Sequence, residues 1–198
     1  MYRLILVFSA LLVMFLCLGA VDVNAEEGHH TLGVQAGQVG LAGDVGSAYG
    51  NALGVGGFFD YAASDWLELE LSYLMSRHSS NNLNLTQSDY AAYMVYNIDT
   101  LDAFTPYLKG GAEFVGHTQD ITVPSGILTS QNYTGFGLNI GLGGKFQFGS
   151  TFSSGLDVVY HNMFDVSATP PGAPASQKVI QSFYTVMLRF GFSFGGAK

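Results

Sequence analysis

Residues 136–148, with the sequence FGLNIGLGGKFQF, divide by alternation into two kinds of side chain. Successive side chains of a β-strand point to opposite faces, so the alternation predicts a strand with one apolar face and one small or polar face. About ten residues of tilted strand cross a bilayer, and this stretch is long enough. The apolar parity consists of Phe136, Leu138, Ile140, Leu142, Phe146 and Phe148.

The opposite parity is glycine or polar throughout: Gly137, Asn139, Gly141, Gly143, Lys145 and Gln147. A face of this kind suits the crowded interior of a small barrel better than a surface open to water. The whole chain has 26 glycines among 198 residues, roughly twice the usual share of about 7%. That density disfavours long helices, so the sequence predicts an all-β fold.

The same alternation recurs in eight segments of the chain. The connections that follow them are long and polar after the first, third, fifth and seventh segments, and short after the others. Long loops at one end and tight turns at the other predict an eight-stranded antiparallel up-and-down transmembrane β-barrel. The segments are residues 31–39, 52–62, 66–78, 90–98, 105–117, 133–148, 152–165 and 178–194. The long connections are residues 40–51, 79–89, 118–132 and 166–177.

A soluble barrel of lipocalin type is the alternative for eight such strands. Its outward positions would face water and should be polar. The outward positions of the eighth segment are instead apolar, which favours the membrane barrel. They are Tyr184, Val186, Leu188, Phe190, Phe192 and Phe194.

The N-terminus has the pattern of a secretory signal peptide. Arg3 precedes an apolar run from Leu4 to Leu18, and Val23 and Ala25 are small residues at the positions that precede a cleavage site. The prediction is therefore a signal peptide over residues 1–25 and one barrel domain over residues 26–198. Export across the inner membrane agrees with a position in the bacterial outer membrane.

The segment from Pro106 to Phe114, PYLKGGAEF, carries a resemblance. It is similar to the Pro-Tyr-x-x-x-Gly-x-aromatic strand of small outer-membrane β-barrels: the OmpA transmembrane domain, the opacity and Ail/Lom surface proteins, and OmpW-like proteins. The resemblance implies the same eight-stranded fold. It also implies an internal cluster of charged residues, assembly by the barrel-assembly machinery, and contact with outer-membrane lipid and lipopolysaccharide.

Charged residues within the predicted strands gather on the inward parity. An isolated buried charge is costly, so these groups are expected to pair with one another or to be hydrated. We predict a lumen ion network, with Lys109 and Lys145 at similar depth on neighbouring strands. Its members are Glu68, Glu70, Lys109, Glu113, Lys145, Asp157 and Arg189, with Asp60 on the same parity.

Other sites are weakly supported by the sequence. His78, His117 and His161 have no tight ligand spacing, so they are predicted to be scattered histidines at the barrel rim, and no metal or cofactor is expected. His161 lies in the sequence YHNM, which lacks the serine of the His-x-Ser-Asn sequence found in outer-membrane lipid A deacylases. No enzyme activity and no catalytic residue are therefore expected. The net charge of −8 disfavours nucleic acid as a partner.

These observations favour a structural or narrow-pore (porin-like) outer-membrane barrel with surface loops. An eight-stranded barrel is filled by its own side chains or holds one small ligand, which excludes bulk diffusion of the kind that large porins support. Three alternatives stay open. They are OmpW-like transport of small apolar molecules, a surface adhesin that binds an extracellular ligand with its loops, and a lipid A-modifying enzyme.

Overall fold

The computed structural model describes residues 29–43, 46, 49–80, 83–98, 104–122, 128–164, 167–168, 177–178 and 182–195. The predicted signal peptide, residues 1–25, lies outside these ranges. No helix in the described part is long and apolar enough to cross a membrane. The strands are β1 (His29–Leu41), β2 (Asn51–Ala62), β3 (Leu67–Ser80), β4 (Leu83–Asn97), β5 (Phe104–Thr122), β6 (Leu128–Phe148), β7 (Phe152–Phe164), β8 (Ser167–Ala168), β9 (Gln177–Lys178) and β10 (Ser182–Gly195).

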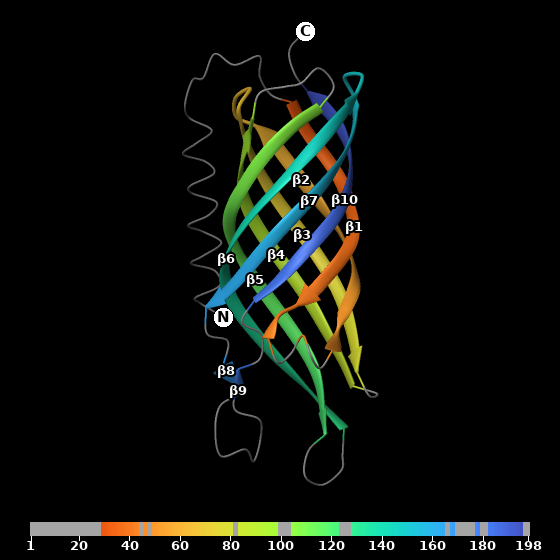
Figure 1. Cartoon of the computed structure of the whole chain (residues 1–198), viewed down its shortest axis with the longest axis vertical. Helices are drawn as coiled ribbons and strands as arrows, with labels where there is room; N and C mark the ends of the chain where they lie inside the picture. Colours follow the sequence, from red (N-terminus) through yellow and green to blue (C-terminus); the bar gives the residue numbers. More distant parts are fainter. Residues whose placement is uncertain are drawn as a thin grey trace.

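Eight of these strands form one closed antiparallel barrel in the order β1-β10-β7-β6-β5-β4-β3-β2. Each strand pairs with its neighbour in the chain, and β1 pairs with β10 from His29–Gly195 to Leu41–Phe183 to close the ring. The short β8 and β9 form a separate two-stranded ribbon. The predicted fold class is confirmed (Figure 1).

The two faces of the wall follow the alternation of the sequence. On β6, Ile140 and Leu142 are 68% and 59% exposed, whereas Asn139 between its glycine neighbours is 6% exposed. On β10, Leu188 and Phe190 point outward and Arg189 between them is buried. The barrel therefore has an apolar exterior and a polar interior, which is the arrangement required for contact with lipid.

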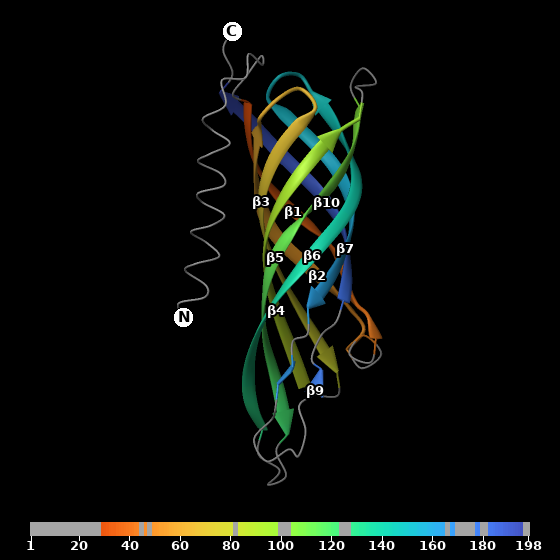
Figure 2. The ribbon, with the colours of Figure 1, turned by 90° about the vertical axis from the view of Figure 1, so that its left-hand side faces the viewer.

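Three strands extend beyond their predicted bounds by five residues or more. Strand β4 begins at Leu83 instead of residue 90. Strand β5 ends at Thr122 instead of residue 117, and β6 begins at Leu128 instead of residue 133. The predicted loops 79–89 and 118–132 are therefore wrong for most of their length, because they continue the ladders between β3 and β4 and between β5 and β6. Figures 1 and 2 show β5 and β6 extending beyond the other barrel strands at the bottom of the views.

Aromatic ring pairs lie near both ends of the barrel wall. Toward the long connections, the rings of Tyr73 and Tyr90 are 4.9 Å apart between centroids. Toward the short turns, Phe104 and Phe146 are 4.7 Å apart, and Gly149 with φ of +68° lies in the tight turn after β6. Aromatic residues at two levels are typical of the two membrane–water interfaces.

Apolar side chains fill the part of the lumen nearest the long connections. We call this group the apolar layer. All its members are less than about a tenth exposed, and the rings of Tyr49 and Tyr133 pack against it. The layer consists of Val39, Leu41, Leu74, Leu85, Val115, Met163, Phe183 and Met187.

Neighbouring glycines on β5 differ in the space that surrounds them. A Cβ atom on Gly111 would lie 2.0 Å from the carbonyl oxygen of Ala92, whereas one on Gly110 would meet nothing closer than 3.6 Å. We expect Gly111→Ala to destabilise the barrel by about 1–3 kcal/mol, because β4 and β5 must separate. Gly110→Ala is the matched control and should gain about 0.5–1 kcal/mol, since alanine restricts the unfolded strand more than glycine.

Equilibrium unfolding in urea from lipid vesicles would measure both variants. Equal effects of the two substitutions would contradict the close approach of β4 and β5 at Gly111.

Candidate functional site

Four charged side chains form a buried layer across the barrel, which we call the ionic layer. Arg189 Nη1 lies 2.8 Å from Glu70 Oε2 and 3.1 Å from Asp157 Oδ2. Lys109 Nζ lies 3.2 Å from Glu70 Oε1 and also pairs with Asp157. The Tyr107 hydroxyl donates a hydrogen bond to Asp157. Two cations and two carboxylates thus share one set of contacts.

The ionic layer joins strands that are not neighbours in the wall. Arg189 on β10 and Glu70 on β3 are separated in the ring by β1 and β2, while Lys109 on β5 and Asp157 on β7 are separated by β6. The four residues are at most 6% exposed. The contacts of Glu70 with Arg189 and Lys109, and of Lys109 with Asp157, therefore cross the lumen, and Arg189–Asp157 links the neighbouring strands β10 and β7.

Aromatic rings cover the two cations of the ionic layer. The guanidinium carbon of Arg189 is 3.7 Å from the ring centroid of Phe58, and Lys109 Nζ is 4.4 Å from that of Tyr93. Both rings are themselves buried. Cation–π contacts are strongest where water is excluded, so the rings stabilise the charges as well as filling the lumen.

A second ion pair lies nearer the short turns. Lys145 pairs with Glu68, which also accepts a hydrogen bond of 2.8 Å from Asn97 Nδ2. Lys145 faces Thr105 in the β5–β6 ladder, four residues from the Lys109–Gly141 pair. The prediction that Lys109 and Lys145 have similar depth is therefore wrong.

Asp60 lies on the same side of the ionic layer as this pair. Its Oδ2 is 3.5 Å from Arg189 Nη2, so three carboxylates surround the Arg189 guanidinium.

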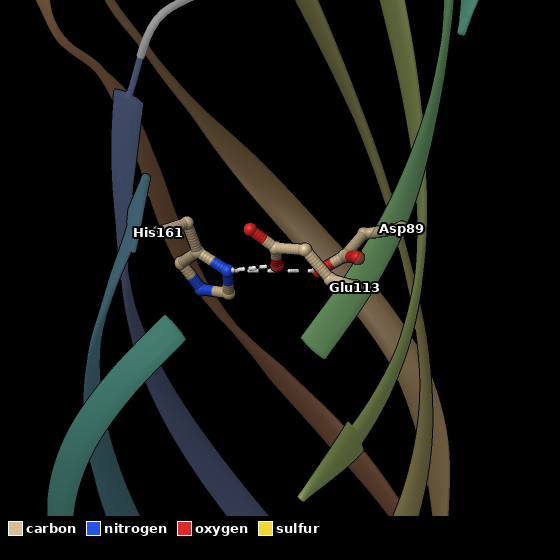
Figure 3. A group of neighbouring side chains, drawn as sticks. All are labelled: Asp89, Glu113 and His161. Atoms are coloured by element: carbon tan, nitrogen blue, oxygen red, sulfur yellow. Dashed lines mark hydrogen bonds and ion pairs between the residues drawn. The ribbon is translucent and has the colours of Figure 1, made fainter. Parts of the chain in front are cut away.

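Glu113 does not join the ionic layer. Its Oε2 lies 2.5 Å from Nδ1 of His161, and the Oδ2 of Asp89 is 3.9 Å from the same nitrogen. We call Asp89, Glu113 and His161 the carboxylate–histidine group. All three are at most 3% exposed, and they come from β4, β5 and β7 (Figure 3). The seven residues predicted to form one network therefore lie in three separate groups: the ionic layer, the Lys145–Glu68 pair and the carboxylate–histidine group.

The prediction of scattered rim histidines is wrong. His78, His117 and His161 are each at most 2% exposed. His78 contacts the hydroxyl of Ser76 at 3.1 Å and the carbonyl of Gly50 at 3.0 Å. His161 stacks on Phe183 of the apolar layer, with ring centroids 4.0 Å apart and an angle of 8°.

Two small cavities lie among the described residues of the lumen. One cavity of about 20 Å³ lies beside Asp60, Glu68 and Lys145, and another of about 10 Å³ lies beside Asp89, His161 and Thr185. A single water occupies about 10–15 Å³ on this measure. Each cavity therefore holds no more than one or two waters.

Polar side chains join the strand extensions at the long-connection end. Asp120 accepts hydrogen bonds from the hydroxyl of Ser130 at 2.7 Å and from Asn84 Nδ2 at 3.2 Å. These two bonds, with Ser130 the stronger influence, lower the pKa of Asp120 below the usual range of a carboxyl group. Asp120 thus stays ionised on this polar end of the barrel.

A family model described as "Outer membrane protein beta-barrel domain" matches residues 8–194. The chain belongs to this family. The bacterial outer membrane is therefore its location, and outer-membrane lipid surrounds the exposed apolar wall. The predicted resemblance to small eight-stranded outer-membrane β-barrels is confirmed by this family and by the closed barrel. Among curated proteins, none matches the chain.

Several solved structures share the fold at low sequence identity. Neisserial surface protein A is 14% identical, with a TM-score of 0.67, and covers 85% of this chain and 100% of its own. OprG from Pseudomonas aeruginosa is 16% identical, with a TM-score of 0.58, over 87% and 98%. Ail of Yersinia pestis, crystallised with the heparin analogue sucrose octasulfate, is 17% identical, with a TM-score of 0.54, over 85% and 99%.

Some interior contacts were not predicted from the sequence. Asp89 fell in a predicted loop, Tyr107 was given no interior partner, and Asn139 was placed on the inward face without a partner. The alternation could have assigned two of these residues to the lumen. Asp89 is two residues from Ala91 and Tyr107 is two residues from Lys109, and Ala91 and Lys109 both face inward.

Proposed function

We propose that this family member is a structural outer-membrane barrel whose lumen is closed by its own side chains. The observation that carries the proposal is the set of contacts between Arg189, Glu70, Lys109 and Asp157, which joins strands on different sides of the ring. An eight-stranded barrel is narrow enough for such contacts to fill it.

A second layer supports closure. The apolar layer, which includes Leu85, Val115 and Phe183 with no measurable exposure, lies between the ionic layer and the long connections. Ions are poorly solvated next to apolar side chains, so this layer opposes ion passage even where the charges are removed. The predicted narrow pore then requires the movement of two different layers.

Single-channel recording in planar bilayers tests the proposal. We expect the refolded mature chain to be electrically silent, and we expect the Lys109→Ala/Arg189→Ala variant to be silent too, because the apolar layer remains. Lys145→Ala, outside the ionic layer, is the matched control. The heat-dependent shift in gel migration that folded barrels show would verify folding of each protein before recording.

Stable openings of the wild-type chain would contradict the proposal. Openings that occur only after the loss of Lys109 and Arg189 would favour the narrow-pore alternative, with the ionic layer as its gate.

Transport of small apolar molecules is less well supported. A carrier needs a dry pocket that is open to the lipid or the cell exterior. The two cavities described above are water-sized and are lined partly by polar, ionisable side chains such as Asp60, Lys145 and Asp89.

Adhesion has some support from the extended hairpins, whereas lipid modification has none from the position of His161. The extended hairpins of β3–β4 and β5–β6 place polar groups beyond the aromatic level, which suits a surface ligand, but the net charge of −8 opposes a polyanion. His161 faces the barrel interior, between Glu113 and Phe183, instead of the lipid where a lipid A ester would lie. We therefore propose no enzymatic activity.

Assembly by the barrel-assembly machinery is also part of the proposal. Phe192 and Phe194 on the last strand are the residues that this machinery would recognise.

A further inference from the structure

The carboxylate–histidine group has an unbalanced charge. Asp89 and Glu113 are at most 3% exposed, and within the described residues His161 is their one partner at ion-pair distance. The ionic layer, in contrast, supplies Lys109 and Arg189 to its carboxylates. Two buried carboxylates beside one imidazole must be balanced by a bound cation or by protons, because burial of unpaired anions is very costly.

The contacts of His161 place both ring nitrogens beside oxygen atoms. Nε2 lies 3.3 Å from the Thr185 hydroxyl, and Nδ1 lies 2.5 Å from Glu113 Oε2. In one tautomer the Thr185 hydroxyl donates to Nε2 and Nδ1–H donates to Glu113. In the other, Nε2 donates to Thr185 and Nδ1 presents its lone pair to the carboxylate. A lone pair and a carboxylate oxygen at this distance repel unless a positive species lies between them.

Neighbouring oxygens are unsatisfied and could serve as further ligands. Asp89 Oδ1, Glu113 Oε1 and Asn139 Oδ1 are buried without a hydrogen-bond partner. Asn139 is joined to the group because its Nδ2 donates to Glu113 Oε2 at 3.2 Å. Buried polar groups normally have a partner, so orphaned oxygens at one place in the lumen indicate a missing one.

We propose that Asp89, Glu113 and His161 bind one divalent transition-metal ion inside the barrel, in the class represented by Zn²⁺. One ligand atom from each lies within 4.8 Å of the other two. Ligands at about 2.0–2.2 Å in a tetrahedral site are about 3.3–3.5 Å apart, so modest side-chain shifts bring them into position (Figure 3).

Other residues around the group fit the remaining needs of such a site. One neutral imidazole and two carboxylates are ligands that zinc accepts. Thr185 would hold the ring of His161 through Nε2, as partners of ligating histidines commonly do. The adjoining cavity of about 10 Å³ has room for one water as a further ligand.

Refolding in the presence of Zn²⁺ tests the proposal. The full mature chain would be refolded in detergent with ZnCl₂, freed of unbound ion by desalting against a weak chelator, and its zinc measured by atomic emission. We expect one retained Zn²⁺ per folded wild-type barrel. His161→Gln, Asp89→Asn and Glu113→Gln preserve side-chain size, and each should abolish retention. Thr185→Val should weaken binding by about 10–100-fold.

His117→Gln is the matched control. His117 is also buried, on the inward face of β5, and neither of its ring nitrogens has a hydrogen-bond partner, so it is the strongest competing imidazole. His29 and His30 are present in every variant and contribute equally. Loss of zinc from His117→Gln, or equal retention by His161→Gln, would overturn the proposal. Absence of retained zinc from the folded wild type would do the same and would assign the positive charge to a proton.

Discussion

Replacing Arg189 by alanine is expected to destabilise the folded barrel by about 3–5 kcal/mol, the cost of breaking a buried ion pair from one side. The guanidinium is 2.8 Å from Glu70, 3.1 Å from Asp157 and 3.5 Å from Asp60. Its loss leaves Glu70 and Asp157 with Lys109 as their shared cation and removes the Asp60 contact with Arg189, in a place that water reaches poorly. Urea-dependent equilibrium unfolding from lipid vesicles would measure the change.

Lys145→Ala provides the comparison for this prediction. The side chains of Lys145 and Glu68 are 29% and 13% exposed, so water replaces part of the lost interaction. We expect a loss of less than about 1 kcal/mol, as for other exposed ion pairs. Equal losses for Arg189→Ala and Lys145→Ala would contradict the distinction between a dry ionic layer and a hydrated mouth.

A charge-balanced double variant separates electrostatics from packing. Adding Glu70→Gln to Arg189→Ala removes one of the stranded negative charges at almost constant volume. Recovery of part of the lost stability is expected, since uncompensated charge is the main penalty. No recovery would indicate that the cost of Arg189→Ala arises from the space it leaves beside Phe58.

The sequence predicted the fold because the bilayer acts on every wall residue. Lipid selects apolar side chains on one parity, and the narrow lumen selects glycine or polar groups on the other. That selection ends where the strands leave the membrane. Residues 83–89 of β4, LNLTQSD, mix polar residues on both parities, so the alternation that identifies a membrane strand is absent there. The extensions of β4, β5 and β6 were therefore predicted as loops.

The membership of the interior clusters was harder to predict than the parity. Parity assigns a residue to a face but not to a depth, which depends on how tilted strands are staggered in the closed barrel. Lys109 and Lys145 differ by about 13 Å along their strands, from four residues at about 3.3 Å each. Glu113 was grouped with the lysines for the same reason, although the stagger of β4 and β7 brings it to Asp89 and His161.

Replacing Ile140 by arginine should cost about 2–4 kcal/mol of folding free energy, the penalty for this charge at the bilayer midplane on the lipid face of a barrel. Ile140 is 68% exposed and lies on β6 between the aromatic levels marked by Phe136 and Phe148, inside the apolar band. Ile140→Ala would be measured in parallel to subtract the loss of the apolar side chain.

Phe148→Arg is the matched control, because Phe148 has the same parity on the same strand and is 61% exposed. It lies at the short-turn end, where an arginine reaches the polar interface and costs only about 0–1 kcal/mol. Subtraction of Phe148→Ala removes the effect of losing the ring. The difference between the two positions then reports depth alone, because both side chains face outward from one strand. Equal penalties at Ile140 and Phe148 would mean that no hydrocarbon layer surrounds the wall, and the outward apolar face would need another explanation.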